Sequence, residues 1–444
     1  MFRGQVIVSS PRKGMHSFHY QRGKLCCESY PLDKAAERFG TPLYVYSSHT
    51  IVDHYQRLDQ ALNELRHEIC YAVKANSNLS VIRLLADQGA GFDIVSGGEL
   101  YRVIKAGGNP AKCTFAGVGK TREEIEYALR NQILSFNIES EEELYEIDGA
   151  ARALGKRAPI AIRVNPDVAA NTHKYISTGK TENKFGIGID HVAEIYEHAK
   201  ALGNITIRGV QMHIGSQITE SKPFVQAIER LVPLVRRLKS ECGIEFFSVG
   251  GGIGIVYHGS LESGDEVWWR QDEPKHSLTI EEYAKSTVPL LKNLPVRVLL
   301  EPGRFLVGNA GVLLTRVLYV KKTPVKTFVI VDAGMNDLIR PALYEGYHEI
   351  VPVNEPRNEQ RTIVDVVGPV CESGDFFALD RPLAQVESGD VLALMSAGAY
   401  GFTMASNYNS RPLPAEVLVT GSEARIIRRR QTYADLISLE IPDS

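Results

Sequence analysis

A lysine stands at the end of a short apolar run near residue 70. The run Ile69–Val73 has the length and composition of a buried strand, Lys74 follows it directly, and a helical pattern covers Leu79–Asp87. A lysine at a strand tip can point into a cleft, where loss of hydration lowers the pKa of the amine and lets it form a Schiff base. Taken alone, the stretch is explained more simply by a solvated loop lysine, since most lysines are exposed.

Polar residues and glycines also stand at the carboxyl ends of other apolar runs. They are Asp93, His213, Ser216, Gly250, Gly251, Gly252, Glu301, Gly303 and Arg304. Each has a structural alternative: a tight turn for the glycines, a hydrogen-bonded core position for His213, and an ion pair between Glu301 and Arg304. In a barrel of parallel strands these ends meet at one face, where the chemistry of such folds takes place.

Together these groups suit one cofactor. Pyridoxal 5'-phosphate (PLP) requires a Schiff-base lysine, an acid partner for its pyridine nitrogen, a side chain that covers its ring, and a phosphate site. The glycine run Gly250–Gly254 follows the seventh apolar run, where barrels bind phosphate through bare backbone N–H groups. A lysine, a carboxylate, a histidine and a phosphate cradle therefore predict a PLP site, and we expect no metal.

The elements that must position these residues alternate regularly. Helical patterns separate most of eight apolar strand candidates, which are Ile69–Val73, Gly91–Ile94, Cys113–Ala116, Ile133–Ile138, Pro159–Val164, Ile205–Ile214, Ile244–Val249 and Val296–Glu301. The count and the span of about 235 residues favour a (β/α)8 TIM-like barrel, whose usual size is roughly 250 residues. A doubly wound open sheet is the structural alternative.

The pattern changes after Arg304. Short β-branched runs with turn residues between them extend from Val312 to Leu418, which predicts a second, mostly antiparallel β domain. We expect a PLP-binding barrel over residues 34–304 and a β domain over residues 305–444, joined by residues 1–33. Two segments interrupt the barrel pattern. Val168–Gly188 reads as a functional loop, and Tyr257–Lys275 as an insertion.

Composition excludes several classes of protein. The chain has 444 residues, 44% hydrophobic and 23% charged, and its net charge of −3 indicates no nucleic-acid or anionic-membrane partner. No apolar run approaches the roughly 20 residues that span a bilayer, and the first residues do not resemble a signal peptide. The six cysteines lack paired spacing. We therefore expect a reducing, cytoplasmic compartment.

Several motifs resemble one family of enzymes. The stretches Tyr71–Asn76, His213–Gln217, Gly250–Gly252 and Glu301–Arg304 resemble the PLP-dependent decarboxylases with an alanine-racemase-like barrel. Further stretches narrow the resemblance to the diaminopimelate decarboxylases: His173–Gly179, Arg340–Tyr344, Cys371–Asp375 and Gly398–Gly401. The resemblance covers nearly the whole chain. Tyr257–Lys275 is its least typical part, being longer, more acidic and tryptophan-bearing.

The resemblance implies a role for each candidate residue. Lys74 binds the cofactor covalently, His213 stacks on its ring and Glu301 faces its pyridine nitrogen. The remaining cofactor-binding residues it implies are Asp93, Ser216, Gly250, Gly251, Gly252, Gly303, Arg304 and Tyr400. The substrate-binding residues it implies are Arg304, Arg340, Tyr344, Glu372 and Tyr400. Cys371 is implied as the proton donor, and it is expected with Glu372 from the neighbouring subunit of a homodimer; without the resemblance, Cys371 reads as a small buried hydrophobe.

The resemblance also implies the reaction. It is decarboxylation of meso-2,6-diaminopimelate to L-lysine and CO2, the last step of lysine biosynthesis. Two alternatives stay open on the same scaffold: a decarboxylase of ornithine, lysine or arginine, and an amino-acid racemase. A non-catalytic PLP-binding or regulatory relative is a third, although such a protein would tend to lose Lys74 or the acid, and both are present.

Overall fold

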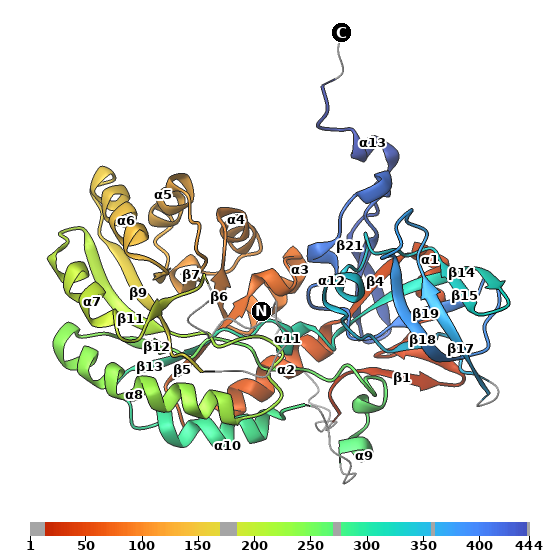
Figure 1. The fold of residues 1–444 in the computed structure, drawn as a ribbon, viewed down its shortest axis with the longest axis horizontal. Helices are drawn as coiled ribbons and strands as arrows, with labels where there is room; N and C mark the ends of the chain where they lie inside the picture. The colour runs from red at the N-terminus through yellow and green to blue at the C-terminus, as the bar shows by residue number, and fades with distance from the viewer. Residues whose placement is uncertain (1–13, 169–183, 270–276, 357–359, 442–444) are drawn as a thin grey trace, which may run out of the picture.

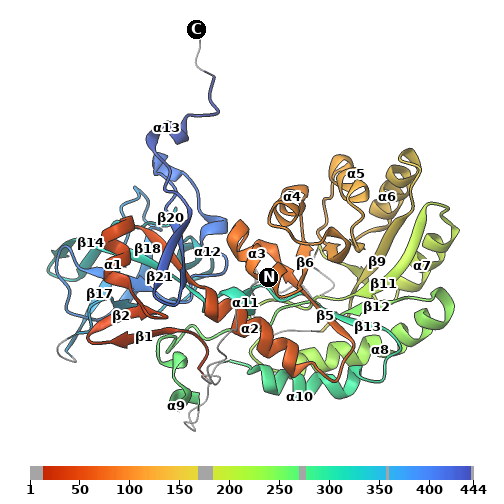
Figure 2. The same cartoon turned by 180° about the vertical axis from the view of Figure 1, so that it is seen from behind.

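Two units lie side by side in the structure, a computed structural model that describes residues 14–168, 184–269, 277–356 and 360–441. One is a barrel of parallel strands ringed by helices, and the other is built mainly from antiparallel strands (Figure 1). Seen from behind, α2 (Ser48–Ala61) and α11 (Arg304–Val307) lie where the units meet (Figure 2).

The barrel closes because β8 and β9, which stand at the two ends of the order of its eight strands, also pair with each other. In sequence order its eight strands are β5 (His67–Ala72), β6 (Gly91–Ile94), β7 (Cys113–Phe115), β8 (Ser135–Ile138), β9 (Ala158–Asn165), β11 (Ile205–Gln211), β12 (Phe246–Ser248) and β13 (Arg297–Leu300). Short β10 (Ile187–Gly188) pairs with β9. Every predicted strand is present, so the predicted barrel is confirmed and the open sheet is wrong.

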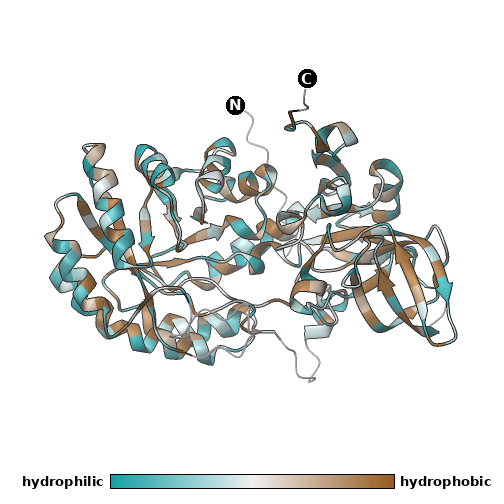
Figure 3. Ribbon diagram, turned by 45° about the horizontal axis from the view of Figure 1, so that its top comes forward, coloured by the Kyte–Doolittle hydropathy of each residue, from teal (hydrophilic) through white to brown (hydrophobic). Residues whose placement is uncertain are grey.

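Helices cover the outside of the barrel and bury their apolar faces against it (Figure 3). Thr121 and Thr279 each begin a helix with a capping box, which fixes where α5 and α10 start. Besides α2 and α11 the helices of this unit are α3 (Leu79–Asp87), α4 (Gly97–Lys105), α5 (Arg122–Arg130), α6 (Glu141–Ala153), α7 (Val192–Ala201), α8 (Lys222–Cys242), α9 (Glu266–Trp269) and α10 (Ile280–Leu291).

The second unit has the predicted, mostly antiparallel strands. Its main sheet has the order β18-β17-β15-β14-β4-β20-β21, and β16 joins it through β19, which pairs with β14. The strands are β4 (Leu43–Ser47), β14 (Gly311–Lys322), β15 (Thr327–Val331), β16 (Ile350–Pro352), β17 (Arg361–Val367), β18 (Phe376–Ala384), β19 (Val391–Leu394), β20 (Ala415–Thr420) and β21 (Glu423–Arg428). Two helices, α12 (Arg340–Tyr344) and α13 (Tyr433–Leu436), complete it.

Strand β4 lies in the second unit, although the sequence analysis counted its residues with the barrel. Tyr46 pairs with Gly311 of β14, and Leu43 pairs with Ala415 of β20. A short apolar strand carries no sequence signal for which sheet it joins, so its position before a helix suggested the barrel. We propose that the barrel unit begins near Ser48.

The N-terminal strands pack on the same unit. They are β1 (Phe18–Gln21), β2 (Lys24–Cys27) and β3 (Tyr30–Pro31), followed by α1 (Leu32–Phe39). The backbone N–H of Leu25 donates to the carbonyl of Val353 over 2.8 Å, and Leu25 shares an apolar cluster with Val312. Within the described ranges we find no helix long and apolar enough to cross a membrane.

Contacts between the units hold a loop of the second over the end of β5. The backbone N–H of Tyr400 donates to the carbonyl of Ala75 over 2.8 Å, and the side-chain amide of Asn76 donates to the carbonyl of Gly398 over 3.2 Å. Both barrel residues, Ala75 and Asn76, directly follow Lys74 in the chain. Residues of the second unit therefore face the carboxyl ends of the barrel strands.

Candidate active site

A cavity of about 1000 Å³ opens at the carboxyl ends of the barrel strands. Both units supply its walls, and most of the site residues predicted from the sequence line it. Those residues are Lys74, Asp93, His213, Ser216, Gly252, Glu301, Gly303, Arg304, Arg340, Tyr344 and Tyr400. The structure thus brings together side chains that lie more than 300 positions apart in the chain.

Lys74 lies in a single 3-10 turn that follows β5, and its side chain is 40% exposed. Its Nζ lies 3.3 Å from Oδ2 of Asp93. Burial opposes the charged amine, but the Asp93 carboxyl and other nearby acids outweigh it, so the pKa of Lys74 lies above its usual value. The expected lowering of this pKa is therefore wrong for the arrangement seen here, because the sequence did not reveal that Asp93 is its partner.

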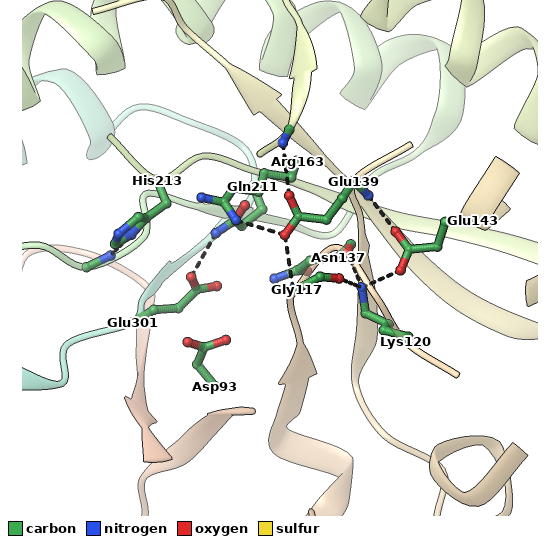
Figure 4. Close-up of polar contacts among 12 residues, drawn as sticks. Asp93, Gly117, Lys120, Asn137, Glu139, Glu143, Arg163, Gln211, His213 and Glu301 are labelled. Atoms are coloured by element: carbon green, nitrogen blue, oxygen red, sulfur yellow. Dashed lines mark hydrogen bonds and ion pairs between the residues drawn. The ribbon is translucent and has the colours of Figure 1, made fainter. Parts of the chain in front are cut away.

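Glu301 is buried at the barrel end, beside Gln211 and Asp93 (Figure 4), and both of its carboxyl oxygens accept hydrogen bonds. Its Oε2 accepts from Nε2 of Gln211, and its Oε1 accepts from Oγ of Ser248, each over 2.8 Å. Burial and the neighbouring Asp93 raise the pKa of Glu301 to about 7, and the two donors act in the opposite direction. Burial raises the pKa of Asp93 as well.

His213 presents a neutral ring to the cavity. Its Nδ1 accepts from the backbone N–H of Gly251 over 3.2 Å, which requires that Nδ1 carry no proton. Burial, then Arg163 and Lys74, lower the pKa of His213 well below its usual value. A flat, uncharged ring is suited to stacking on an aromatic cofactor.

The glycines after β12 allow a close backbone approach. A Cβ on Gly250, Gly251 or Gly252 would lie 2.1 to 2.3 Å from a backbone oxygen of Met212, Glu301 or Gly215. Gly252 lines the cavity, while Gly250 and Gly251 pack behind it against His213 and Glu301. Any side chain here would push these strand ends apart, so the cradle depends on glycine.

Two arginines face the cavity without an acidic partner among the described residues. Arg304 and Arg340 are 6% and 7% exposed, and neither forms an ion pair within the described ranges. The ring of Tyr257 lies between them, 5.9 Å from Cζ of Arg304 and 4.7 Å from Cζ of Arg340. Tyr257 Oη also accepts from Nη1 of Arg304 over 2.5 Å. Two buried cations without an acidic partner among the described residues suit this part of the cavity to an anion.

Cys371 and Glu372 do not line the cavity of their own chain. Both are exposed, on a tight turn in which Asp375 accepts from the backbone N–H groups of Met335 and Val370. The backbone N–H of Cys371 donates to the side chain of Asn409. The motif at residues 173–179 lies outside the described residues.

Several residues of the site were missed by the sequence analysis. Gln211 and Ser248 interrupt apolar strands, and a polar residue inside such a run was the signal that could have found them. Arg163 of β9 is the same case; its Nη1 donates to Oε1 of Glu139 over 2.8 Å beside the cavity (Figure 4). Tyr257 comes from the insertion, and its role depends on contacts that no local pattern predicts.

These residues fit PLP. The buried Oδ1 of Asp93 and Nε of Arg304 have no hydrogen-bond partner among the described residues, so polar groups are left for a ligand. The glycine cradle suits the phosphate of the cofactor, the neutral His213 ring suits its aromatic ring, and the hydrogen-bonded Glu301 suits its pyridine nitrogen.

Comparisons with known proteins point in the same direction. The model of the pyridoxal binding domain of pyridoxal-dependent decarboxylases matches residues 48–308. The chain is 48% identical to the diaminopimelate decarboxylase of Vibrio cholerae and 50% identical to that of Pseudomonas fluorescens, each match covering 96% of this chain and 99% of the relative.

Solved structures agree with these matches. The diaminopimelate decarboxylase of Helicobacter pylori complexed with L-lysine is 41% identical, with a TM-score of 0.85 over 92% of this chain and 99% of that chain. The M. jannaschii enzyme in complex with L-lysine is 39% identical, with a TM-score of 0.88 over 97% and 99%.

Proposed function

The chain belongs to the family of diaminopimelate decarboxylases, and from this membership we propose how its residues divide the work. It is a PLP-dependent carboxy-lyase that converts meso-2,6-diaminopimelate to L-lysine and CO2, the last step of lysine biosynthesis. The observation that supports this choice of substrate is the pair of buried arginines, Arg304 and Arg340, which have no acidic partner among the described residues. Ornithine, lysine and arginine bear only a cation at the far end, and such a cation would be repelled here.

Residues of the barrel, together with Tyr400 of the second unit, would hold the cofactor. Lys74 would bind it covalently, Glu301 would accept from its pyridine nitrogen and His213 would stack on its ring. The remaining cofactor-binding residues would be Asp93, Ser216, Gly250, Gly251, Gly252, Gly303, Arg304 and Tyr400. When bound, PLP accepts the electron pair of the bond that breaks as CO2 leaves.

The acids of the barrel keep protons where the reaction needs them. The hydrogen bonds from Gln211 and Ser248 favour the ionised form of Glu301, and this carboxylate would hold a proton on the pyridine nitrogen. Asp93 accepts from Nζ of Lys74, so it stabilises the proton on this amine until the amine reacts. Burial raises the pKa of Asp93, while the Lys74 amine acts in the opposite direction.

The substrate end that does not react carries both an ammonium and a carboxylate. Arg304, Arg340 and Tyr344 bind the carboxylate, because the arginine fork donates two hydrogen bonds at once. Glu372 of a second subunit binds the ammonium, and Cys371 of that subunit donates the proton that replaces CO2. Support comes from the exposure of both residues, which lie outside the cavity of their own chain.

The enzyme acts as a homodimer with shared active sites, and we assign it to the cytoplasm. This assignment rests on the six cysteines, which lack the paired spacing of a disulfide framework. We also assign PLP binding to the barrel, up to residue 304, and treat residues 305–444, together with the N-terminal strands, as the β domain.

One experiment tests the function. The purified holoenzyme is incubated with meso-diaminopimelate, L-lysine, L-ornithine or L-arginine, and released CO2 and amine products are measured. We expect CO2 and L-lysine from diaminopimelate only. Preference for ornithine or lysine would make it a decarboxylase of another basic amino acid, and inversion without CO2 release would make it a racemase.

A further inference from the structure

His348, a residue of the second unit, is fully buried beside Arg340, one of the two arginines that face the cavity. It has 0% exposure, and both ring nitrogens have partners. Nδ1 lies 2.8 Å from the carbonyl oxygen of Met395, and Nε2 lies 2.7 Å from Nη1 of Arg340. A carbonyl only accepts and a guanidinium only donates, so Nδ1 carries the proton and Nε2 accepts from Arg340. Only the neutral tautomer with its proton on Nδ1 satisfies both contacts.

The surroundings of His348 keep it in this form. The ring of Tyr257 meets it edge-on, with centroids 5.4 Å apart, and the same ring lies under the guanidinium of Arg340. The charged groups that act on it are Arg340, Arg304 and Arg381, and Arg381 also donates to its carbonyl oxygen. Burial and these cations lower the pKa of His348 to about 3.

A neutral acceptor has a consequence that an acidic one would not have. A carboxylate at this position would fix Arg340 equally well, but it would cancel the positive charge that an incoming carboxylate must meet. The Nε2 lone pair fixes one N–H group and leaves the charge intact. The sequence places Glu345 nearer in the chain, yet the hydrogen-bond partner of Arg340 is His348.

We propose that His348 is a positioning residue for substrate recognition, which holds Arg340 ready for the far carboxylate of a dicarboxylic diamino acid. This role rests on the proposed function, and it deepens it. Loss of the Nε2 acceptor would let the Arg340 side chain leave its position against Tyr257, so binding of the carboxylate would have to order it again.

Two substitutions separate the contacts of His348. In His348→Gln the amide oxygen reaches the position of Nε2 and can accept from Arg340. In His348→Asn the shorter amide reaches only the position of Nδ1, so it keeps the bond to Met395 and loses Arg340. His198→Asn is the matched control, because His198 is a partly exposed histidine that pairs with Glu141 on the outer helices.

Two ligands separate binding of the far carboxylate from binding of the rest of the molecule. L-lysine, the product, keeps the far carboxylate and ammonium, whereas cadaverine (1,5-diaminopentane) has no carboxylate. We measure their Kd values for each holoenzyme by calorimetry, together with KM and kcat for diaminopimelate and the thermal unfolding midpoint.

We expect H348N to weaken L-lysine binding and to raise the KM for diaminopimelate about tenfold, equivalent to about 1.4 kcal/mol. The Kd of cadaverine should not change, and H348Q should stay close to the wild type and to H198N. Equal losses in H348Q and H348N, or equal weakening of cadaverine, would overturn the proposal and leave His348 a packing residue.

Two further outcomes keep the test decisive. If H348N does not fold, H348Q alone decides, since retained L-lysine binding supports the role and a tenfold loss overturns it. A wild-type enzyme that releases no CO2 from diaminopimelate would overturn the proposed function itself. If the wild type is active but the losses in H348N and H348Q are equal, only the role of His348 is overturned.

Discussion

Asp93 raises the pKa of its neighbour Glu301, and burial raises the pKa of both carboxyls at the barrel end. Their partners differ. Asp93 pairs with the amine of Lys74, whereas Glu301 receives two neutral donors, Gln211 and Ser248. One carboxyl thus faces a charged amine, whereas the other receives two neutral hydrogen bonds that favour its ionised form.

Ser248→Ala should move the acidic limb of the activity profile to higher pH. Loss of one donor to the Glu301 carboxylate raises its pKa from about 7, and the protonated acid cannot hold a proton on the pyridine nitrogen. A hydrogen bond to a charged group predicts a displacement of about one pH unit. The measurement is kcat between pH 5.5 and 9. Ser135→Ala, a buried serine of β8, is the control, and an unchanged or lowered limb in Ser248→Ala would refute this role.

The purified protein should be yellow, because PLP joined to Lys74 absorbs near the visible edge. Lys74→Ala should abolish the adduct that borohydride traps, while the fold survives, since this side chain is not part of the packed core. Peptide mapping by mass spectrometry locates the adduct. Lys184→Ala, which removes another lysine of the cavity wall, should still be trapped. An adduct on any lysine other than Lys74 would disprove the assignment.

Arg340→Ala should cut kcat/KM for diaminopimelate by roughly two orders of magnitude or more, since loss of one partner in a desolvated charge contact costs about 2–5 kcal/mol. The deciding quantity is the ratio of decarboxylation rates for diaminopimelate and lysine, which should fall sharply.

Glu345→Gln is the control for Arg340, because Glu345 is the acid with which a purely structural Arg340 would pair. It should keep the wild-type ratio. A variant Arg340→Ala that is less stable, but that keeps the wild-type preference, would show that Arg340 is structural.

Mixing inactive Lys74→Ala with inactive Cys371→Ala subunits should restore activity. Each heterodimer then contains one site with an intact lysine and an intact cysteine, so random exchange predicts about a quarter of the wild-type rate. Subunit exchange is followed with differently tagged chains on an affinity column. No recovery after demonstrated exchange would mean that Cys371 does not serve the neighbouring subunit's site.

The barrel was predictable because its signals are local. The strand ending before Lys74 and the seven that follow are apolar runs between helices. Each of these runs forms a strand in the structure. The polar residues at their ends, from Asp93 to Glu301, were found for the same reason. The sheet to which a strand belongs was less predictable, because it depends on residues far apart in the chain. Nothing in the sequence of β4 indicates that its neighbours are β14 and β20.

The chemistry of individual groups was less predictable than their location. The pKa of Lys74 was expected to fall and instead rises, because the ion pair with Asp93 joins two strands that the chain only brings together by folding. Tyr257 and His348 lay in segments without a helical or strand period, so nothing marked them as supports of the arginines. Cys371 was suggested by the family resemblance alone.

Strand β4 lies inside the main sheet of the second unit, between β14 and β20, and this position makes the unit discontinuous in sequence. The chain starts the sheet, leaves it through α2 to build the whole barrel, and returns at β14, which pairs directly with β4. During synthesis the sheet therefore cannot be completed until the barrel has left the ribosome. A fragment cut at residue 305 would lack an interior strand and expose two unpaired edges, an arrangement that favours aggregation.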